Sequence, residues 1–271
     1  MLNKEFPLDK KSIHRLSTNG LSLETIKPQL DYGLDLSLEL WRAKGLDIIK
    51  KKGYFFFHTK FVDVSDAEFC IVDIETNGSK LEKHQIIEIA AVKVKNNKII
   101  DRFESLVKCD RINEHITQIT GISVEDTKDA PSLKDVLYKF KLFLGDAIFV
   151  AHDVKFDYNF ISGSFEQVGL EPILNRYLCS LALAERTIVS YRYALSYLSE
   201  YLHINPNATH HRAMSDVMTT YELFILSLEN CTENINNVED LIRFSKEAPR
   251  VKRPKFDPLL ETKESEEIVS E

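Results

Sequence analysis

The sequence has few cysteines and no long apolar segment. Its four cysteines lie far apart and include no C-x-x-C pair, which disfavours both a disulfide framework and a zinc knuckle (Cys70, Cys109, Cys179 and Cys231). No apolar run approaches the roughly 18 residues that a membrane span needs, and the first residues contain no apolar segment that could act as a signal. We therefore expect a soluble protein in the reducing environment of the cytoplasm.

The sequence also lacks the glycine patterns that bind nucleotide phosphates. Residues 77–80, Asn-Gly-Ser-Lys, lack the first glycine of a P-loop and the helix that should follow it. No G-x-G-x-x-G pattern follows a predicted strand, as a dinucleotide-binding fold requires. Both classes of nucleotide-binding protein are therefore unsupported.

Basic residues are outnumbered by acidic ones. The chain has 35 lysines and arginines against 42 aspartates and glutamates, so its formal net charge is −7 at pH 7. This balance argues against a protein that coats nucleic acid through bulk charge, but not against an enzyme that meets phosphate with bound cations. Two short basic clusters, residues 50–52 and 252–255, are more typical of a solvated turn and a solvated tail than of a nucleic-acid contact.

The chain does have enough apolar residues for a substantial core, and its elements follow a regular order. Hydrophobic residues make up 44% of the chain, which excludes disorder of the whole protein. The periodicity predicts strands at residues 69–75, 85–95, 98–108, 147–151 and 176–180, and helices at 132–144, 153–168, 181–188, 194–202 and 213–228. Three successive strands followed by alternating helices and strands predict an α/β fold, with a mixed sheet flanked by helices.

The two ends of the chain differ from this pattern. Residues 1–65 predict three helices followed by two strand-like runs, which is similar to a small winged helix-turn-helix unit. A further helix is expected near residues 236–246. Residues 249–271 are charged and contain two prolines, which indicates a disordered tail. The expected domains are therefore residues 1–65, residues 66–230, and a helix with its tail at residues 231–271.

Two carboxylates share one face of the first strand of the sheet. Asp73 and Glu75 are two residues apart, so they project together, while Val72 and Ile74 project from the other face. An ordinary half-exposed strand would explain an isolated D-x-E pair. However, the run is apolar, as in a strand covered on both sides, and two like charges there raise each other's pKa unless a cation intervenes. A divalent metal ion is the simplest such cation.

A second acidic segment follows the strand at residues 147–151. Residues 151–157 read Ala-His-Asp-Val-Lys-Phe-Asp, where a buried strand passes into a helix. Asp157 falls in the first turns of that helix, where the helix dipole alone would favour an acid. Asp153 is well placed to cap the helix.

A third segment contains His211 and Asp216. On one regular helix their side chains would point about 140° apart, so they could share a site only if His211 lies in the loop before the helix. A lone loop histidine is usually a surface residue. Neither His203 nor His210 has metal-ligand spacing with a cysteine pair, so a zinc site is not expected.

In this order, the three segments resemble the motifs of the DEDDh family of 3′–5′ exonucleases, and the chain is similar to the proofreading epsilon subunit of bacterial DNA polymerase III. The resemblance covers about residues 66–230, including 119–122 and 130–132, and implies an RNase-H-like fold. Asp153 departs from the family pattern, which commonly has Asn there, and this difference bears on substrate or metal preference. A sister family carries a catalytic tyrosine four residues before the last aspartate. This chain has Arg212 there, so the histidine version is favoured.

The resemblance implies hydrolysis of the terminal phosphodiester at a DNA 3′ end, releasing a nucleoside 5′-monophosphate. Two Mg²⁺ or Mn²⁺ ions would be bound by four carboxylates, with His211 as the general base and Thr76 along the terminal nucleotide (Asp73, Glu75, Asp157 and Asp216). The implied substrate end is single-stranded or mismatched, and the implied partner is a replicative polymerase. Residues 249–271 either attach to that polymerase or form a solubilising tail, and we expect them to be dispensable for cutting.

Two other functions remain open. The same fold could serve an exoribonuclease or a general single-strand nuclease. Alternatively, the chain could be a non-catalytic DNA-binding or holoenzyme component in which residues 1–65 carry the function. The presence of all five candidate catalytic side chains counts against this last alternative.

Overall fold

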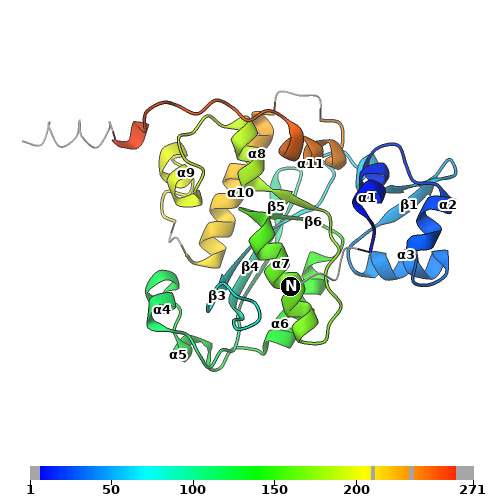
Figure 1. The fold of residues 1–271 in the computed structure, drawn as a ribbon. Coiled ribbons are helices and arrows are strands. Elements are labelled where there is room, and N and C mark those ends of the chain that lie inside the picture. Colours follow the sequence, from blue (N-terminus) through cyan, green and yellow to red (C-terminus); the bar gives the residue numbers. More distant parts are fainter. Residues whose placement is uncertain (1–6, 209–210, 232–234, 261–271) are drawn as a thin grey trace, which may run out of the picture.

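A five-stranded mixed sheet forms the centre of the protein (Figure 1). The computed structural model describes residues 7–208, 211–231 and 235–260. The strand order is β5-β4-β3-β6-β7, in which β5, β4 and β3 pair antiparallel and β3, β6 and β7 pair parallel. The strands are β3 (Phe69–Thr76), β4 (Ile86–Lys95), β5 (Lys98–Leu106), β6 (Ile148–Ala151) and β7 (Tyr177–Cys179).

Helices cover both faces of this sheet. On one face, α6 (Leu133–Leu144) and α7 (Val154–Gln167) bury Cys70, Val72 and Ile74 of β3. On the other face, α10 (Ala213–Glu229) and α11 (Val238–Glu247) bury Phe69 and Ile71. The alternation of β3 side chains therefore places Asp73 and Glu75 together on one face, as the sequence predicted, and α10 covers this face.

Four shorter helices complete this part of the chain. A separate apolar cluster joins α8 (Ser180–Thr187) and α9 (Leu195–Leu202) to α10. Two helices were not predicted from the sequence, α4 (Glu114–Thr120) and α5 (Val124–Thr127). They are too short to show a helical period, although Asn113 and Ser123 are recognisable capping residues: each side chain accepts a backbone N–H of the first turn.

The N-terminal residues form three helices and a hairpin around a core of their own, in Figure 1 on the right. Leu21 bridges Phe55 through two backbone hydrogen bonds and thereby adds a third short strand segment to the hairpin. These elements are α1 (Lys10–Ser17), α2 (Leu23–Ile26), η1 (Lys27–Gln29), α3 (Leu34–Ala43), β1 (Ile48–Lys51), β2 (Tyr54–Phe57) and η2 (His58–Phe61). A winged-helix-like arrangement and a domain boundary near residue 65 stay predictions.

The predicted disordered tail differs from the structure in its first half. Residues 249–260, which we name the C-terminal strap, lie along α8 and α9. Arg250 and Arg253 each bind the buried carboxylate of Glu185 at 3.0 Å, and the Tyr197 hydroxyl donates to Asp257 at 2.6 Å. The strap has few apolar residues, and these ion pairs order it instead. Residues 261–271, the rest of the predicted tail, lie outside the described residues.

The length and composition of the helices bear on membrane association. Within residues 7–208, 211–231 and 235–260, no helix is both long enough and apolar enough to cross a membrane.

Candidate active site

The site begins at the C-terminal end of β3. Asp73 and Glu75 are half-buried there, and Glu75 lies close to Asp216 in the first turn of α10. The pairing of β3 with β4 slips by one residue between Glu75 and Thr76, so the strand bulges where it leaves the sheet. Thr76 is half-buried at this bulge, next to the two carboxylates.

The second motif places Asp157 in the first turn of α7. Its carboxylate is buried, with 4% of its surface exposed. Asp153 stands at the N-cap position, but its side chain makes no capping hydrogen bond, so the predicted capping role is wrong. The backbone of Asp153 is left-handed, with φ 66° and ψ 56°, and this conformation directs the side chain away from the helix N–H groups.

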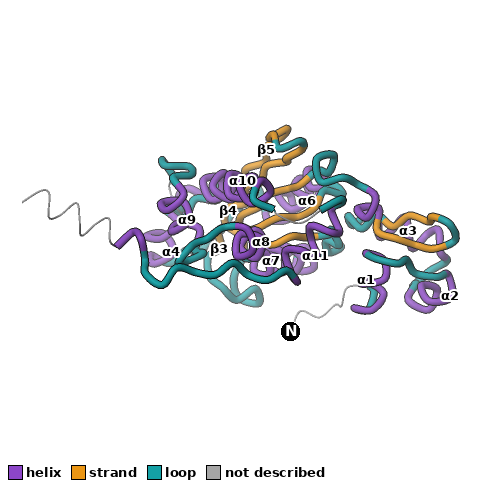
Figure 2. Tube along the Cα trace, turned by 90° about the horizontal axis from the view of Figure 1, so that it is seen from above, coloured by secondary structure: helices purple, strands orange, loops and turns teal. Residues whose placement is uncertain are grey.

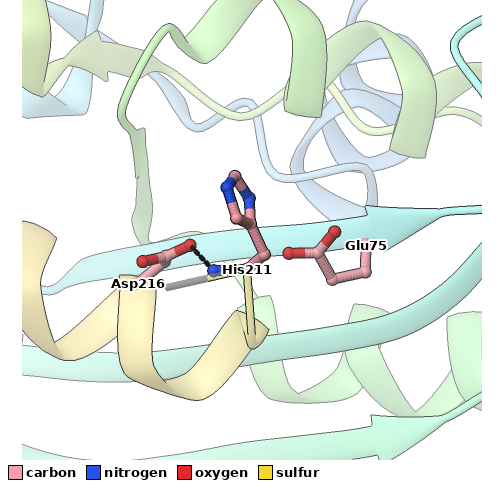
Figure 3. Close-up of side chains that lie close together, drawn as sticks. All are labelled: Glu75, His211 and Asp216. Carbon is pink, nitrogen blue, oxygen red and sulfur yellow. Dashed lines mark hydrogen bonds between the residues drawn. The ribbon is translucent and has the colours of Figure 1, made fainter. Parts of the chain in front are cut away.

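The third motif places His211 in the loop before α10, as the helical geometry required. Arg212 is the N-cap of α10, and His211 is left-handed with φ 63°. The His211 backbone N–H donates to Asp216 Oδ2 at 3.1 Å, which ties the loop to the helix (Figure 3). One ligand atom each of Glu75, His211 and Asp216 lie within 4.8 Å of one another. His210 lies outside the described residues.

The acidic side chains interact strongly through their charges. Burial raises the pKa of Asp73 well above its ordinary range, and the neighbouring charges of Asp157 and Asp216 raise it further. Burial also raises the pKa of Asp157 to about 8, although backbone hydrogen bonds oppose this. The pKa of Glu75 rises to about 7, first through burial and then through Asp216 and Glu88.

Such a cluster suits a divalent cation. A metal ion would replace protons on these carboxylates and offset their mutual repulsion. The oxygen donors of Glu75 and Asp216, with an imidazole nitrogen close by, are ligands for Mg²⁺ or Mn²⁺. The structure thus brings Glu75, His211 and Asp216 together, and Asp73 and Asp157 interact with this group through their charges. The donor set fits the implied metal.

One further residue at the site, Glu88, was missed from the sequence. Glu88 of β4 is opposite Glu75 and has only 1% of its surface exposed. It accepts the Ala213 backbone N–H at 2.9 Å and the Arg212 guanidinium at 2.9 Å. An acid inside the apolar run Ile-Ile-Glu-Ile-Ala-Ala was the available signal, because a buried carboxylate needs a partner.

His152, in the second motif directly after β6, has a structural role. Its ring nitrogens bond the Ser180 hydroxyl at 3.1 Å and the Tyr193 carbonyl at 2.8 Å. Burial lowers the pKa of this imidazole. His152 therefore links the loop before α7 to the segment that precedes α9.

Residues 70–224 match the RNase_T family model, whose description is Exonuclease. The match spans more than half of the chain, and the protein therefore belongs to this exonuclease family, as the motifs indicated. The RNase-H-like fold expected from the resemblance is likewise confirmed, because the structure is similar to those of known exonucleases.

The curated relatives include DNA polymerases III of the PolC type. The polymerase of Staphylococcus haemolyticus is 35% identical over 182 residues, 66% of this chain and 13% of the polymerase. That of Staphylococcus aureus (strain MW2) is 36% identical over 174 residues, 64% of this chain and 12% of the polymerase. The chain thus spans about one eighth of the length of these relatives.

Solved structures of two exonucleases share the fold. Exonuclease X, in complex with 5′ overhanging duplex DNA, is 26% identical with a TM-score of 0.52, over 65% of this chain and 99% of that one. E. coli exonuclease I, in complex with a dA16 oligonucleotide, is 17% identical with a TM-score of 0.56, over 61% of this chain and 41% of that one. The second likeness is one of fold alone.

Proposed function

We propose that this protein is a metal-dependent 3′–5′ exodeoxyribonuclease that releases nucleoside 5′-monophosphates from single-stranded or mismatched DNA 3′ ends. The observation that carries the proposal is the convergence of four carboxylates and an exposed histidine at one end of β3. Their chemistry suits the hydrolysis of a phosphodiester, which must overcome charge repulsion between the site and the phosphate.

The four carboxylates would hold two Mg²⁺ or Mn²⁺ ions (Asp73, Glu75, Asp157 and Asp216). When bound, these ions supply positive charge that stabilises the transition state and lower the pKa of water. His211 accepts the proton of the attacking water at a ring nitrogen, since its exposed ring stands beside Glu75 and Asp216. Thr76, at the bulge of β3, orients the terminal nucleotide.

The choice of DNA and of a polymerase partner is supported by the relatives. PolC-type enzymes are DNA polymerases, and Exonuclease X is seen with duplex DNA. We therefore propose proofreading for a replicative DNA polymerase as the role of this chain. Residues 261–271 are the proposed attachment segment, because the preceding strap is occupied by contacts with α8 and α9.

The proposal is tested by digesting 5′-labelled substrates with Mg²⁺ and with chelator. Three substrates are compared: single-stranded DNA, single-stranded RNA, and a primer-template with a mismatched 3′ end. Stepwise shortening of the DNA from its 3′ end, fastest at the mismatch and absent with chelator, is expected. Preferred digestion of RNA would replace this function with an exoribonuclease, and absence of metal-dependent digestion would leave a non-catalytic component.

Substitutions at the carboxylates test whether this site is responsible for the digestion. Asp73→Ala and Asp157→Ala should abolish digestion while the protein stays folded, because each removes a ligand and also relieves repulsion in the metal-free state. Asp146→Ala, which changes an exposed acid outside the site, is the matched control and should keep full activity. Near wild-type turnover in either of the first two variants would contradict the metal assignment.

A further inference from the structure

The turn of the β1–β2 hairpin carries concentrated positive charge. Lys50, Lys51 and Lys52 are consecutive and exposed, and Gly53 completes a tight turn with φ 85°. In the part of the chain that the structure describes, none of the three lysines has a carboxylate partner within ion-pair distance. A chain with a net charge of −7 thus exposes three neighbouring cations at one tip.

Aromatic rings stand next to these lysines. Tyr54 follows the turn and has 49% of its surface exposed, and Phe61 has 40% exposed. The Lys51 ammonium lies 3.9 Å from the centre of the Phe61 ring, which is packed edge-on against Phe56 at 5.3 Å. Cations combined with exposed aromatic side chains suit a nucleic-acid strand, since the cations meet phosphates and an exposed ring such as that of Tyr54 can stack on a base.

Other exposed parts of the N-terminal residues have the opposite character. Helix α3 exposes Leu36 and Leu40 beside the carboxylates of Asp35 and Glu39. That surface would repel phosphate. The hairpin turn is therefore much better suited to a polyanion than the helix is.

The hairpin is fixed to the catalytic part of the chain. The Leu174 backbone N–H donates to the Lys44 carbonyl at 2.7 Å, and the Thr59 hydroxyl donates to Glu239 at 2.6 Å. The Arg176 guanidinium stacks on the Phe57 ring at 4.3 Å. These contacts hold the hairpin in place at the far end of the molecule from α4 and α9 (Figures 1 and 2).

We propose that the hairpin turn is a second contact for the nucleic-acid strand whose 3′ end occupies the catalytic site. Lys50, Lys51 and Lys52 bind its phosphates, and Tyr54 stacks on a base. This inference rests on the proposed function, because it assigns the turn to the same substrate. The affinity of the protein for single-stranded DNA should then increase with strand length, since only a long strand reaches both the catalytic site and the hairpin.

The test measures binding of the full chain to 5′-fluorescein-labelled oligodeoxythymidine by anisotropy over a range of NaCl concentrations. Asp73→Ala is present in every protein so that the DNA stays intact. The triple variant Lys50→Gln/Lys51→Gln/Lys52→Gln is compared with Lys98→Gln/Lys134→Gln/Lys139→Gln, which removes the same charge from exposed positions of β5 and α6.

For a strand of about 30 nucleotides, the hairpin variant should bind at least about tenfold more weakly at low salt. Its plot of log affinity against log salt should be less steep by about 2, because each phosphate contact with a single strand contributes about 0.7. A strand of about six nucleotides should bind both variants alike. Tyr54→Ala should weaken binding about fivefold or more without changing the slope, and Tyr54→Phe should restore it.

Equal affinity and equal slope for the hairpin and control variants would overturn the inference and leave the lysines as a solvated turn. A loss that appears only with an acidic protein partner, and not with DNA, would also overturn it. Failure of the Asp73→Ala parent itself to bind DNA at low salt would instead count against the proposed function. The two failures are therefore distinguishable.

Discussion

Glu88 is expected to control turnover although it is not a proposed metal ligand. Its buried carboxylate joins β4 to the N-terminal end of α10 by accepting the Ala213 N–H and the Arg212 guanidinium. Arg212 is covalently next to His211, so these bonds anchor the backbone that carries the His211 ring. Glu88→Gln keeps the shape of the side chain but removes its charge and one acceptor oxygen.

The contacts of Glu88 allow the effects of Glu88→Gln on stability and on kcat to be estimated. The bonds to Glu88 are charge-assisted, but the Arg212 side chain is 44% exposed and can be hydrated again, so the loss of stability should be about 2 kcal/mol. For a chain of this size that corresponds to a fall in Tm of several degrees, about 2–4 °C per kcal/mol. Displacing His211 by about 1 Å should lower kcat about 10- to 100-fold and change KM little.

A second buried ion pair provides the matched control. Arg176 and Glu239 form two hydrogen bonds, at 2.8 and 2.6 Å, and only 13% and 1% of their side chains are exposed. Glu239→Gln should therefore lower Tm at least as much as Glu88→Gln. Its kcat should stay near that of the wild type, because Glu239 packs between β7 and the N-terminal residues rather than beside His211.

The assay is steady-state digestion of 5′-labelled single-stranded DNA at a temperature where all variants are folded, with Tm measured in parallel. In a His211→Ala background, Glu88→Gln should lower kcat by less than about threefold. Glu88 acts on turnover through His211, so the effects of the two substitutions on kcat should not add. Equal kcat values for Glu88→Gln and Glu239→Gln, or a full additional loss in the His211→Ala background, would refute the reasoning.

Three further outcomes are expected. His211→Ala should lower kcat about 10²- to 10⁴-fold while sparing Mg²⁺ affinity, whereas His210→Ala should do far less; equal losses would show that the wrong histidine was chosen. In chelator, Tm should fall as the pH rises from about 4.5 through about 7, because the raised pKa of Glu75 means that the folded protein binds this proton more tightly than the unfolded chain does. Mg²⁺ should reverse the fall, and a Tm that does not change with pH would contradict the prediction. Deleting residues 261–271 should weaken binding of the cognate polymerase in a pull-down and leave hydrolysis unchanged. Deleting residues 249–271 should also lower Tm, because it removes the contacts of the strap with Glu185. Equal Tm values for the two deletions would show that the strap does not stabilise the fold.

The main elements could be predicted because their patterns are local. The alternation in β3, the apolar stripe of α10 and the turn signals between β3, β4 and β5 each lie within a few residues of sequence. The placement of His211 followed from helical geometry alone. Helices α4 and α5 were missed because each is shorter than the period that reveals a helix.

What could not be predicted depends on contacts between distant residues. The ion pair of Glu88 with Arg212 joins positions 124 residues apart, and that of Glu185 with Arg253 joins positions 68 apart. Composition therefore suggested disorder for the strap, since it cannot show that a buried carboxylate elsewhere pairs with its arginines. The noncapping side chain of Asp153 likewise depends on a left-handed backbone that the residue type only permits.

The strap also gives the molecule an order of mechanical failure. Tension applied beyond residue 260 would first load the Tyr197–Asp257 hydrogen bond and then the two arginine contacts with Glu185. These side-chain contacts, and the backbone hydrogen bond from the Val251 N–H to the Glu185 carbonyl, would break one after another, whereas α11 is held by a packed apolar face. Under tension at the C-terminal side, the strap would therefore detach from α8 and α9 and extend before the force reaches the sheet that carries the carboxylates.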